Sequence, residues 1–91
     1  MTALFRDLTA QGLVLWRLRR SSNQQLWCTV FERDGELALT FHDPASDRRP
    51  VAETHPHVGP LVDRADELRV LLVGAGWIEV DVALGETEPN H

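Results

Sequence analysis

The spacing of the hydrophobic positions changes once along the chain, and the first part of the pattern predicts β-structure. Residues 13–20, 25–33 and 36–43 are rich in Val, Thr, Phe, Trp and Leu, a composition typical of strands. A fourth strand is expected over 48–54, at a sheet edge, because Pro50 cannot donate a backbone hydrogen bond. Residues 13–54 are therefore predicted to form an antiparallel four-stranded β-meander.

The apolar positions then adopt a spacing of three and four, which predicts an amphipathic helix over residues 57–75. Pro60 suits the first turn of this helix, and Gly76 is typical of its C-terminal end. Alternating apolar and acidic residues over 77–84 predict a short fifth strand, and the polar residues 85–91 are expected to fray. The buried stripe of the helix is expected to consist of Val58, Leu61, Val62, Ala65, Leu68, Leu72 and Ala75.

The dipeptide Asp34-Gly35 lies between the second and third strands and is a strong signal for a two-residue hairpin turn. This turn would fix the pairing of the two strands, with Trp27 opposite His42 and Cys28 opposite Phe41. The first hairpin has no such signal, so its hydrophobic pattern must select the register.

The length of the first hairpin loop decides which tryptophan enters the core. A two- or four-residue loop would place Arg17 and Arg19 among the core side chains, and burying two charges without partners costs several kcal/mol. A loop of odd length instead places Trp16 in the core and Trp27 on the other side of the sheet. The core side is then expected to hold Val14, Trp16, Leu18, Leu26, Cys28, Val30, Leu37, Leu39 and Phe41.

Together these elements predict an α+β fold, in which one C-terminal helix packs on one face of the antiparallel meander. A short helix is expected within the N-terminal segment 1–11, which carries Leu4, Phe5 and Leu8 at helical spacing. A chain of 91 residues is long enough for one core and too short for two, so residues 1–91 are expected to form a single domain.

Composition and charge narrow the range of partners. The net charge of −5 argues against general nucleic-acid binding, although residues 1–33 carry five arginines and two acids, while residues 34–91 carry four arginines and twelve acids. The single cysteine excludes an internal disulfide and fits a reducing compartment. No stretch reaches the roughly 20 apolar residues of a membrane span. We therefore expect a cytoplasmic protein, and the use of arginine without lysine fits a GC-rich bacterial genome.

The sheet face that the helix leaves uncovered is the main candidate site. Aromatic and arginine side chains are enriched at protein contacts, and they also suit base stacking and phosphate contact with single-stranded nucleic acid. We expect this face to mediate homodimerisation or to dock a protein partner. Single-stranded nucleic acid is the alternative, and coverage by the N-terminal segment is a third possibility. The residues expected to make the contact are Leu15, Arg17, Arg19, Trp27, Phe31 and His42.

Two histidines raise the question of a metal site. His55 and His57 flank Pro56, and an extended segment would point both rings to one side, as a pair of metal ligands requires. His42 could supply a third ligand, but no cysteine is expected nearby. The simpler interpretation is a strand-to-helix junction with one of these residues at the helix N-cap, so we expect no metal and no cofactor.

No set of residues predicts catalysis. Cys28 is expected in the core beside Phe41, with a raised pKa that makes its thiol inert. The glycines of residues 73–77 close a helix, whereas a phosphate-binding loop follows a strand and precedes a helix. The helix charges, which include an Asp66–Arg69 pair, are expected to form a solvated face without a cleft. The sequence therefore predicts a non-enzymatic interaction domain.

Overall fold

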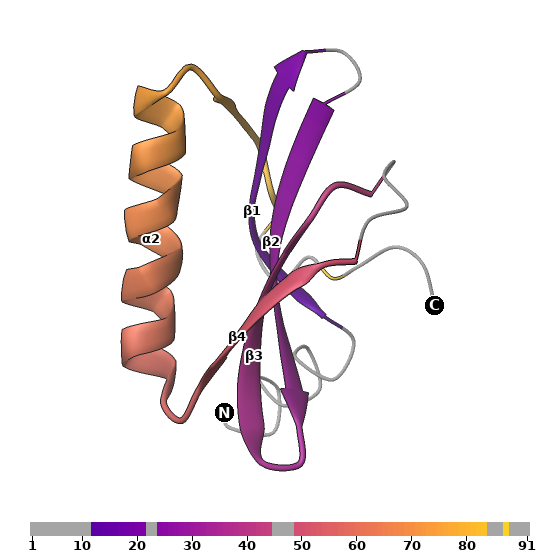
Figure 1. The fold of residues 1–91 in the computed structure, drawn as a ribbon, viewed down its shortest axis with the longest axis vertical. Helices are drawn as coiled ribbons and strands as arrows, with labels where there is room; N and C mark the ends of the chain where they lie inside the picture. Colours follow the sequence, from indigo (N-terminus) through magenta and orange to yellow (C-terminus); the bar gives the residue numbers. More distant parts are fainter. Residues whose placement is uncertain (1–11, 22–23, 45–48, 84–86, 88–91) are drawn as a thin grey trace.

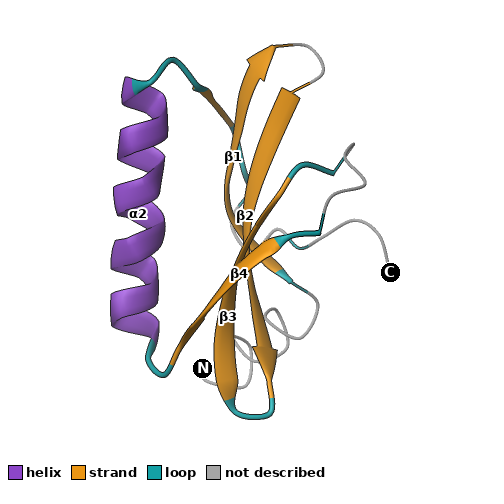
Figure 2. Ribbon diagram, in the orientation of Figure 1, coloured by secondary structure: helices purple, strands orange, loops and turns teal. Residues whose placement is uncertain are grey.

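The computed structural model describes residues 12–21, 24–44, 49–83 and 87 of the chain. Within them the strands form an antiparallel sheet of order β4-β3-β2-β1-β5, and α2 lies along one face of it (Figures 1 and 2). The predicted α+β architecture is confirmed. The expected helix over 1–11 and all of the expected frayed tail except Thr87 lie outside the described residues. The elements are β1 (Leu13–Ser21), β2 (Gln24–Arg33), β3 (Glu36–His42), β4 (Val51–His55), α2 (Val58–Gly74) and β5 (Ile78–Val80).

The turn between β2 and β3 has the geometry that its sequence predicts. Asp34 and Gly35 both have positive φ, 53° and 80°, as a type I′ turn requires. The predicted register follows from this turn, with Trp27 opposite His42 and Cys28 opposite Phe41.

The pairing of β1 with β2 confirms the predicted register of Trp16, but the prediction of an odd loop is wrong. Ser21 pairs with Gln24, so two residues separate the strands, and a bulge at Arg20 gives the register that the odd loop was expected to give.

A second irregularity lies near the start of β1. Trp16 lies opposite Cys28, as expected, but a β-bulge at Leu15 shifts the pairing, so that Val14 lies opposite Thr29. A bulge inserts one residue and reverses the side to which the preceding residues point. Val14 is therefore buried on the face away from α2, and Leu15 packs against the core instead.

The two edge strands are β4 and β5, and both are shorter than their hydrophobic patterns suggest. β4 begins after Pro50 and ends before Pro56, because proline has no backbone N–H for the sheet ladder. The predicted edge position of this strand is confirmed. β5 pairs with β1 over three residues only, and Thr87 then forms an isolated bridge with Leu13.

The core cluster lies between the sheet and α2. Trp16 joins the two layers: its indole Nε1 donates a hydrogen bond of 2.9 Å to the carbonyl oxygen of Ala65, and its ring centroid lies 6.1 Å from that of Phe41. The predicted core position of Trp16 is confirmed. The buried members of the core cluster are Trp16, Leu18, Cys28, Val30, Leu37, Leu39, Leu61 and Ala65.

The helix buries a narrower stripe than the sequence predicts. Its bounds are within one residue of the prediction, with His57 at the N-cap and Pro60 in the first turn. Leu61 and Ala65 are buried, but Val58 and Val62 are exposed, because they lie beside the line of contact with the sheet and not on it. Among the described residues, no helix has both the length and the apolar character needed to cross a membrane.

Candidate functional site

The face of the sheet away from α2 carries a row of side chains that crosses four strands. Val80 of β5 lies opposite Arg17 of β1, Arg17 lies opposite Trp27 of β2, and Trp27 lies opposite His42 of β3. A second row, nearer the end of the first hairpin, pairs Ile78 with Arg19. We call these residues the contact patch: Arg17, Arg19, Trp27, His42, Ile78 and Val80.

Close contacts hold the centre of the contact patch in place. The guanidinium carbon of Arg17 lies 4.4 Å from the centroid of the Trp27 ring, which is a cation–π geometry. The Trp27 and His42 ring centroids are 6.0 Å apart, and the indole Nε1 of Trp27 donates a hydrogen bond of 2.9 Å to Gln25 Oε1. The strands thus present arginine and tryptophan side chains in one fixed arrangement.

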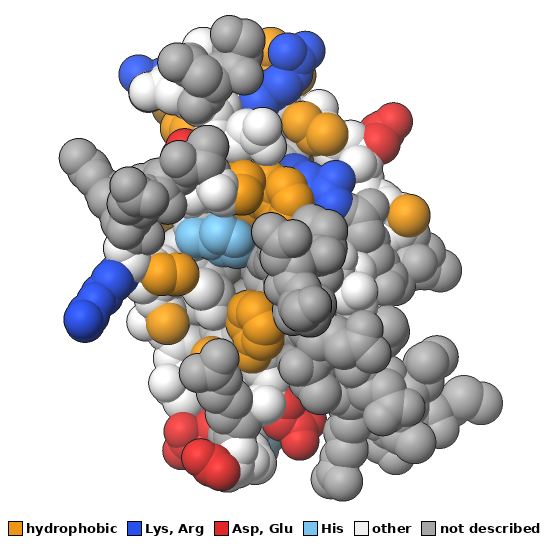
Figure 3. All heavy atoms as spheres, turned by 90° about the vertical axis from the view of Figure 1, so that its right-hand side faces the viewer, with side chains coloured by type: hydrophobic (Ala, Val, Ile, Leu, Met, Phe, Trp, Pro, Cys, Tyr) orange, Lys and Arg blue, Asp and Glu red, His pale blue; other side chains and the backbone are white. Residues whose placement is uncertain are grey.

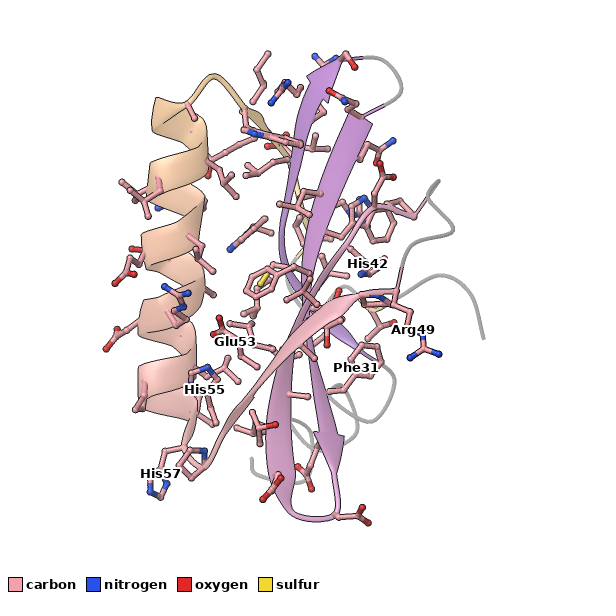
Figure 4. The ribbon with its side chains drawn as sticks, viewed as in Figure 1. Phe31, His42, Arg49, Glu53, His55 and His57 are labelled. Carbon is pink, nitrogen blue, oxygen red and sulfur yellow. The ribbon has the colours of Figure 1, made fainter. Side chains whose placement is uncertain are left out.

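The face is less open than the sequence predicts. Thr29, in its middle, is fully buried, and Trp27, Phe31 and His42 are half-buried. Figure 4 shows Phe31 and His42 on this side of the sheet, and in Figure 3 hydrophobic side chains border the histidine. Leu15, expected here, packs against the core cluster on the other side. Both edge strands carry exposed side chains on this face, with Ala52 and Thr54 on β4 and Ile78 and Val80 on β5.

The hydrophobic pattern did not predict the two most exposed apolar residues of the contact patch. Ile78 is 54% exposed and Val80 is 36% exposed, and both point away from α2 because they pair with Arg19 and Arg17. The alternation of apolar and acidic residues over 77–84 indicated a strand. It did not indicate which neighbour this strand joins, and only the pairing with β1 places Ile78 and Val80 beside Arg17.

The histidines do not converge. His42 lies on the face away from α2, whereas His55 lies on the α2 side, where its Nε2 is 3.3 Å from Glu53 Oε1 (Figure 4). His57 is exposed at the helix N-cap, without a side-chain capping hydrogen bond. In the described ranges, no three His, Cys, Asp or Glu side chains gather in a manner suited to a metal ion.

Two arginines on α2 contact the sheet edges, which corrects the expectation that the charged side of the helix faces only solvent. Arg64 forms a two-pronged ion pair with Glu53 of β4, with Nη2 to Oε2 at 3.2 Å and Nε to Oε1 at 3.2 Å. Arg69 binds Glu79 of β5 at 2.7 Å, as well as its predicted partner Asp66 at 2.6 Å. The helix is thereby connected to both edges of the sheet.

These ion pairs shift the titration of their members. The hydrogen bonds from Arg64 hold the pKa of Glu53 below its ordinary value, with a smaller contribution from His55. The pKa of Arg64 is raised mainly by Glu53, and that of Arg69 mainly by Asp66. Glu53, Arg64 and Arg69 are therefore charged at neutral pH.

Cys28 and one surface pocket are the remaining candidates for chemistry. Burial raises the pKa of the Cys28 thiol, helped by the nearby negative charge of Glu53, which confirms the predicted buried position and raised pKa. A surface pocket of about 340 Å³ opens beside β1 and β5, and its described lining contains no serine, cysteine or histidine. The described lining residues are Leu15, Trp16, Arg17, Arg69, Glu79, Val80, Asp81 and Val82.

Comparison with known proteins gives no assignment. No protein-family model, no curated protein and no solved structure matches the chain. The geometry of the contact patch is therefore the basis for a functional proposal.

Proposed function

We propose that this domain is a non-enzymatic protein-interaction module, and that it makes its contacts through the contact patch. The observation that carries the proposal is the stacked pair Arg17–Trp27, flanked by the exposed Ile78 and Val80 on the same face. Tryptophan and arginine are the residue types most enriched among the residues that dominate protein-binding energy.

The position of Trp27 supports this role because the core does not include it. Trp16 and the rest of the core cluster already join the sheet to α2. A second tryptophan, half-buried on the opposite face, adds little to that packing. Ordered aromatic and arginine side chains outside the core are suited to a contact whose geometry is largely formed before binding.

Single-stranded nucleic acid is a poorer match for the same patch. Base stacking needs an accessible aromatic ring, and the Trp27 indole is half-buried and carries the Arg17 guanidinium 4.4 Å from its centroid. The net charge of −5 also opposes binding to a phosphate backbone. Protein contact therefore remains the better-supported function.

Site-specific photo-crosslinking tests the proposal. A benzophenone amino acid replaces Ile78 in one variant and Val51 in a matched variant, because both are exposed β-branched residues of edge strands and Val51 lies outside the contact patch. Irradiation is carried out on the purified chain and in extract of its source cells. We expect protein adducts from position 78 that decrease when Trp27→Arg is added, and few from position 51. Equal yields from both positions, or adducts insensitive to Trp27→Arg, would refute the proposal.

A further inference from the structure

The outer surface of α2 is a second surface without a described partner, and it lies on the opposite side of the molecule from the contact patch (Figure 1). Its first half is acidic and its second half is aliphatic, and the sequence from residue 70 to residue 76 contains no charged residue. Leu71 is 62% exposed on this surface. The exposed residues of the surface are Asp63, Asp66, Glu67, Val70, Leu71 and Val73.

The two surfaces have opposite charge. The contact patch contains Arg17 and Arg19 and no acidic residue, a charge of +2, whereas the guanidinium carbon of Arg20 lies 5.7 Å from the ring centroid of Trp77, which packs against the core cluster. On the α2 side, Arg64 and Arg69 pair with carboxylates of the sheet edges and of the helix itself. The charged residues of α2 itself are three acids and two arginines, a charge of −1. They are Asp63, Arg64, Asp66, Glu67 and Arg69.

We propose that the contact patch of one copy binds the outer surface of α2 of a second copy. This inference rests on the proposed function and names its partner. The acidic first half of α2 matches Arg17 and Arg19, and the aliphatic second half offers Leu71 and its neighbours to the exposed β5 side chains. An amphipathic helix that lays its apolar side on an apolar surface is a common mode of recognition.

The charges also select the symmetry of the contact. A two-fold contact of patch on patch would bring Arg17 and Arg19 near their own counterparts, and like charges across an interface oppose binding. A patch-on-helix contact joins two different surfaces. Because these surfaces lie on opposite sides of the molecule, a dimer formed in this way still presents one free patch, on one copy, and one free helix, on the other. The association therefore continues head to tail as the concentration rises.

Blocking each surface separately tests this inference. The patch-blocked variant carries Ile78→Glu, which places a carboxylate directly opposite Arg19, and the helix-blocked variant carries Leu71→Arg, both at exposed positions. Val51→Arg is the control, because this exposed residue belongs to neither surface. Sedimentation velocity is measured over a wide range of concentration, at about 0.1 M and 1 M salt, where the screening lengths are about 10 and 3 Å.

We expect the wild type and the control to associate beyond the dimer, more weakly at high salt, and each blocked variant to remain monomeric. An equimolar mixture of the two blocked variants should form one complex of twice the 10.3 kDa chain mass and no larger species, because only one patch and one helix remain competent. A helix-blocked variant that associates like the wild type would overturn the inference.

The outcomes separate this inference from the proposed function. A wild type that is monomeric at every concentration overturns the inference. In that case, crosslinks from position 78 to other proteins would still support the proposed function. A patch-blocked variant that associates like the wild type also overturns the inference, and the crosslinks from position 78 then decide the proposed function.

Discussion

Replacing each tryptophan in turn by phenylalanine tests whether the two indoles have the different roles that the structure gives them. Trp16 is 6% exposed and binds the Ala65 carbonyl across the sheet–helix interface. Trp27 is half-buried, and its indole binds Gln25 on its own strand. Phenylalanine keeps an aromatic ring at either position and removes the indole N–H and part of the volume.

The magnitudes follow from these contacts. For Trp16→Phe, loss of the hydrogen bond costs about 1 kcal/mol and the partly empty indole site costs about 1–2 kcal/mol more. The resulting 2–3 kcal/mol, on the order of a quarter of the stability of a domain this size, should lower the melting temperature by roughly 10–20 °C. For Trp27→Phe, the partly exposed hydrogen bond and the weakened cation–π contact together contribute less than about 1 kcal/mol.

Urea unfolding followed by far-ultraviolet circular dichroism measures both free energies of unfolding without relying on tryptophan fluorescence. Equal slopes in urea for the two variants and the wild type would show that both substitutions act on stability and not on compactness. Equal losses of stability in the two variants, or a larger loss for Trp27→Phe, would refute the assignment of Trp16 to the core and Trp27 to the contact patch.

Three further predictions concern the ion pairs, the thiol and the turn. The lowered pKa of Glu53 stabilises the fold at pH values above the ordinary carboxyl pKa of 4.5, and this contribution is lost as the pH falls. Glu53→Gln should therefore have a lower melting temperature than the wild type at pH 7 and approach it at pH 3. A difference in melting temperature that does not change with pH would contradict this. Cys28 in the native protein should react with a thiol reagent at least about 100-fold more slowly than in denaturant, and equal rates would show that it is not buried. Gly35→Ala should cost about 1 kcal/mol in urea unfolding because its φ is positive, although its added Cβ meets no atom within 4 Å. Gly59→Ala, equally free of contacts but at ordinary φ, is the control and should not destabilise the fold.

The strand and helix positions could be predicted because local signals determined them. Asp34-Gly35 required positive φ at both residues, and that single turn set the whole register between β2 and β3. The cost of burying Arg17 and Arg19 selected the correct register of β1 against β2, although this register arises from a bulge at Arg20 and not from an odd loop. The bulge at Leu15 had no such signal, because an inserted residue leaves the composition of the strand unchanged. The bulge places Val14 on the face away from α2 and packs Leu15 against the core cluster, so the predicted sides of these two residues were wrong.

The candidate site could be predicted only in part. Trp27, Arg17 and His42 follow from strand alternation once the register is known. The contribution of Ile78 and Val80 depends on β5 returning to pair with β1, a contact between residues far apart in the sequence. The ion pairs of Arg64 with Glu53 and of Arg69 with Glu79 likewise depend on how the helix lies across the sheet.

Amide chemical shifts during dilution of the isotope-labelled chain test most directly whether the contact patch of one copy binds α2 of another, because they map contacts residue by residue without a substitution. We expect concentration-dependent shifts centred on residues 17, 19, 27, 78 and 80 and on the outer surface of α2. Shifts confined to β4, or no shifts over a hundredfold range of concentration, would contradict it.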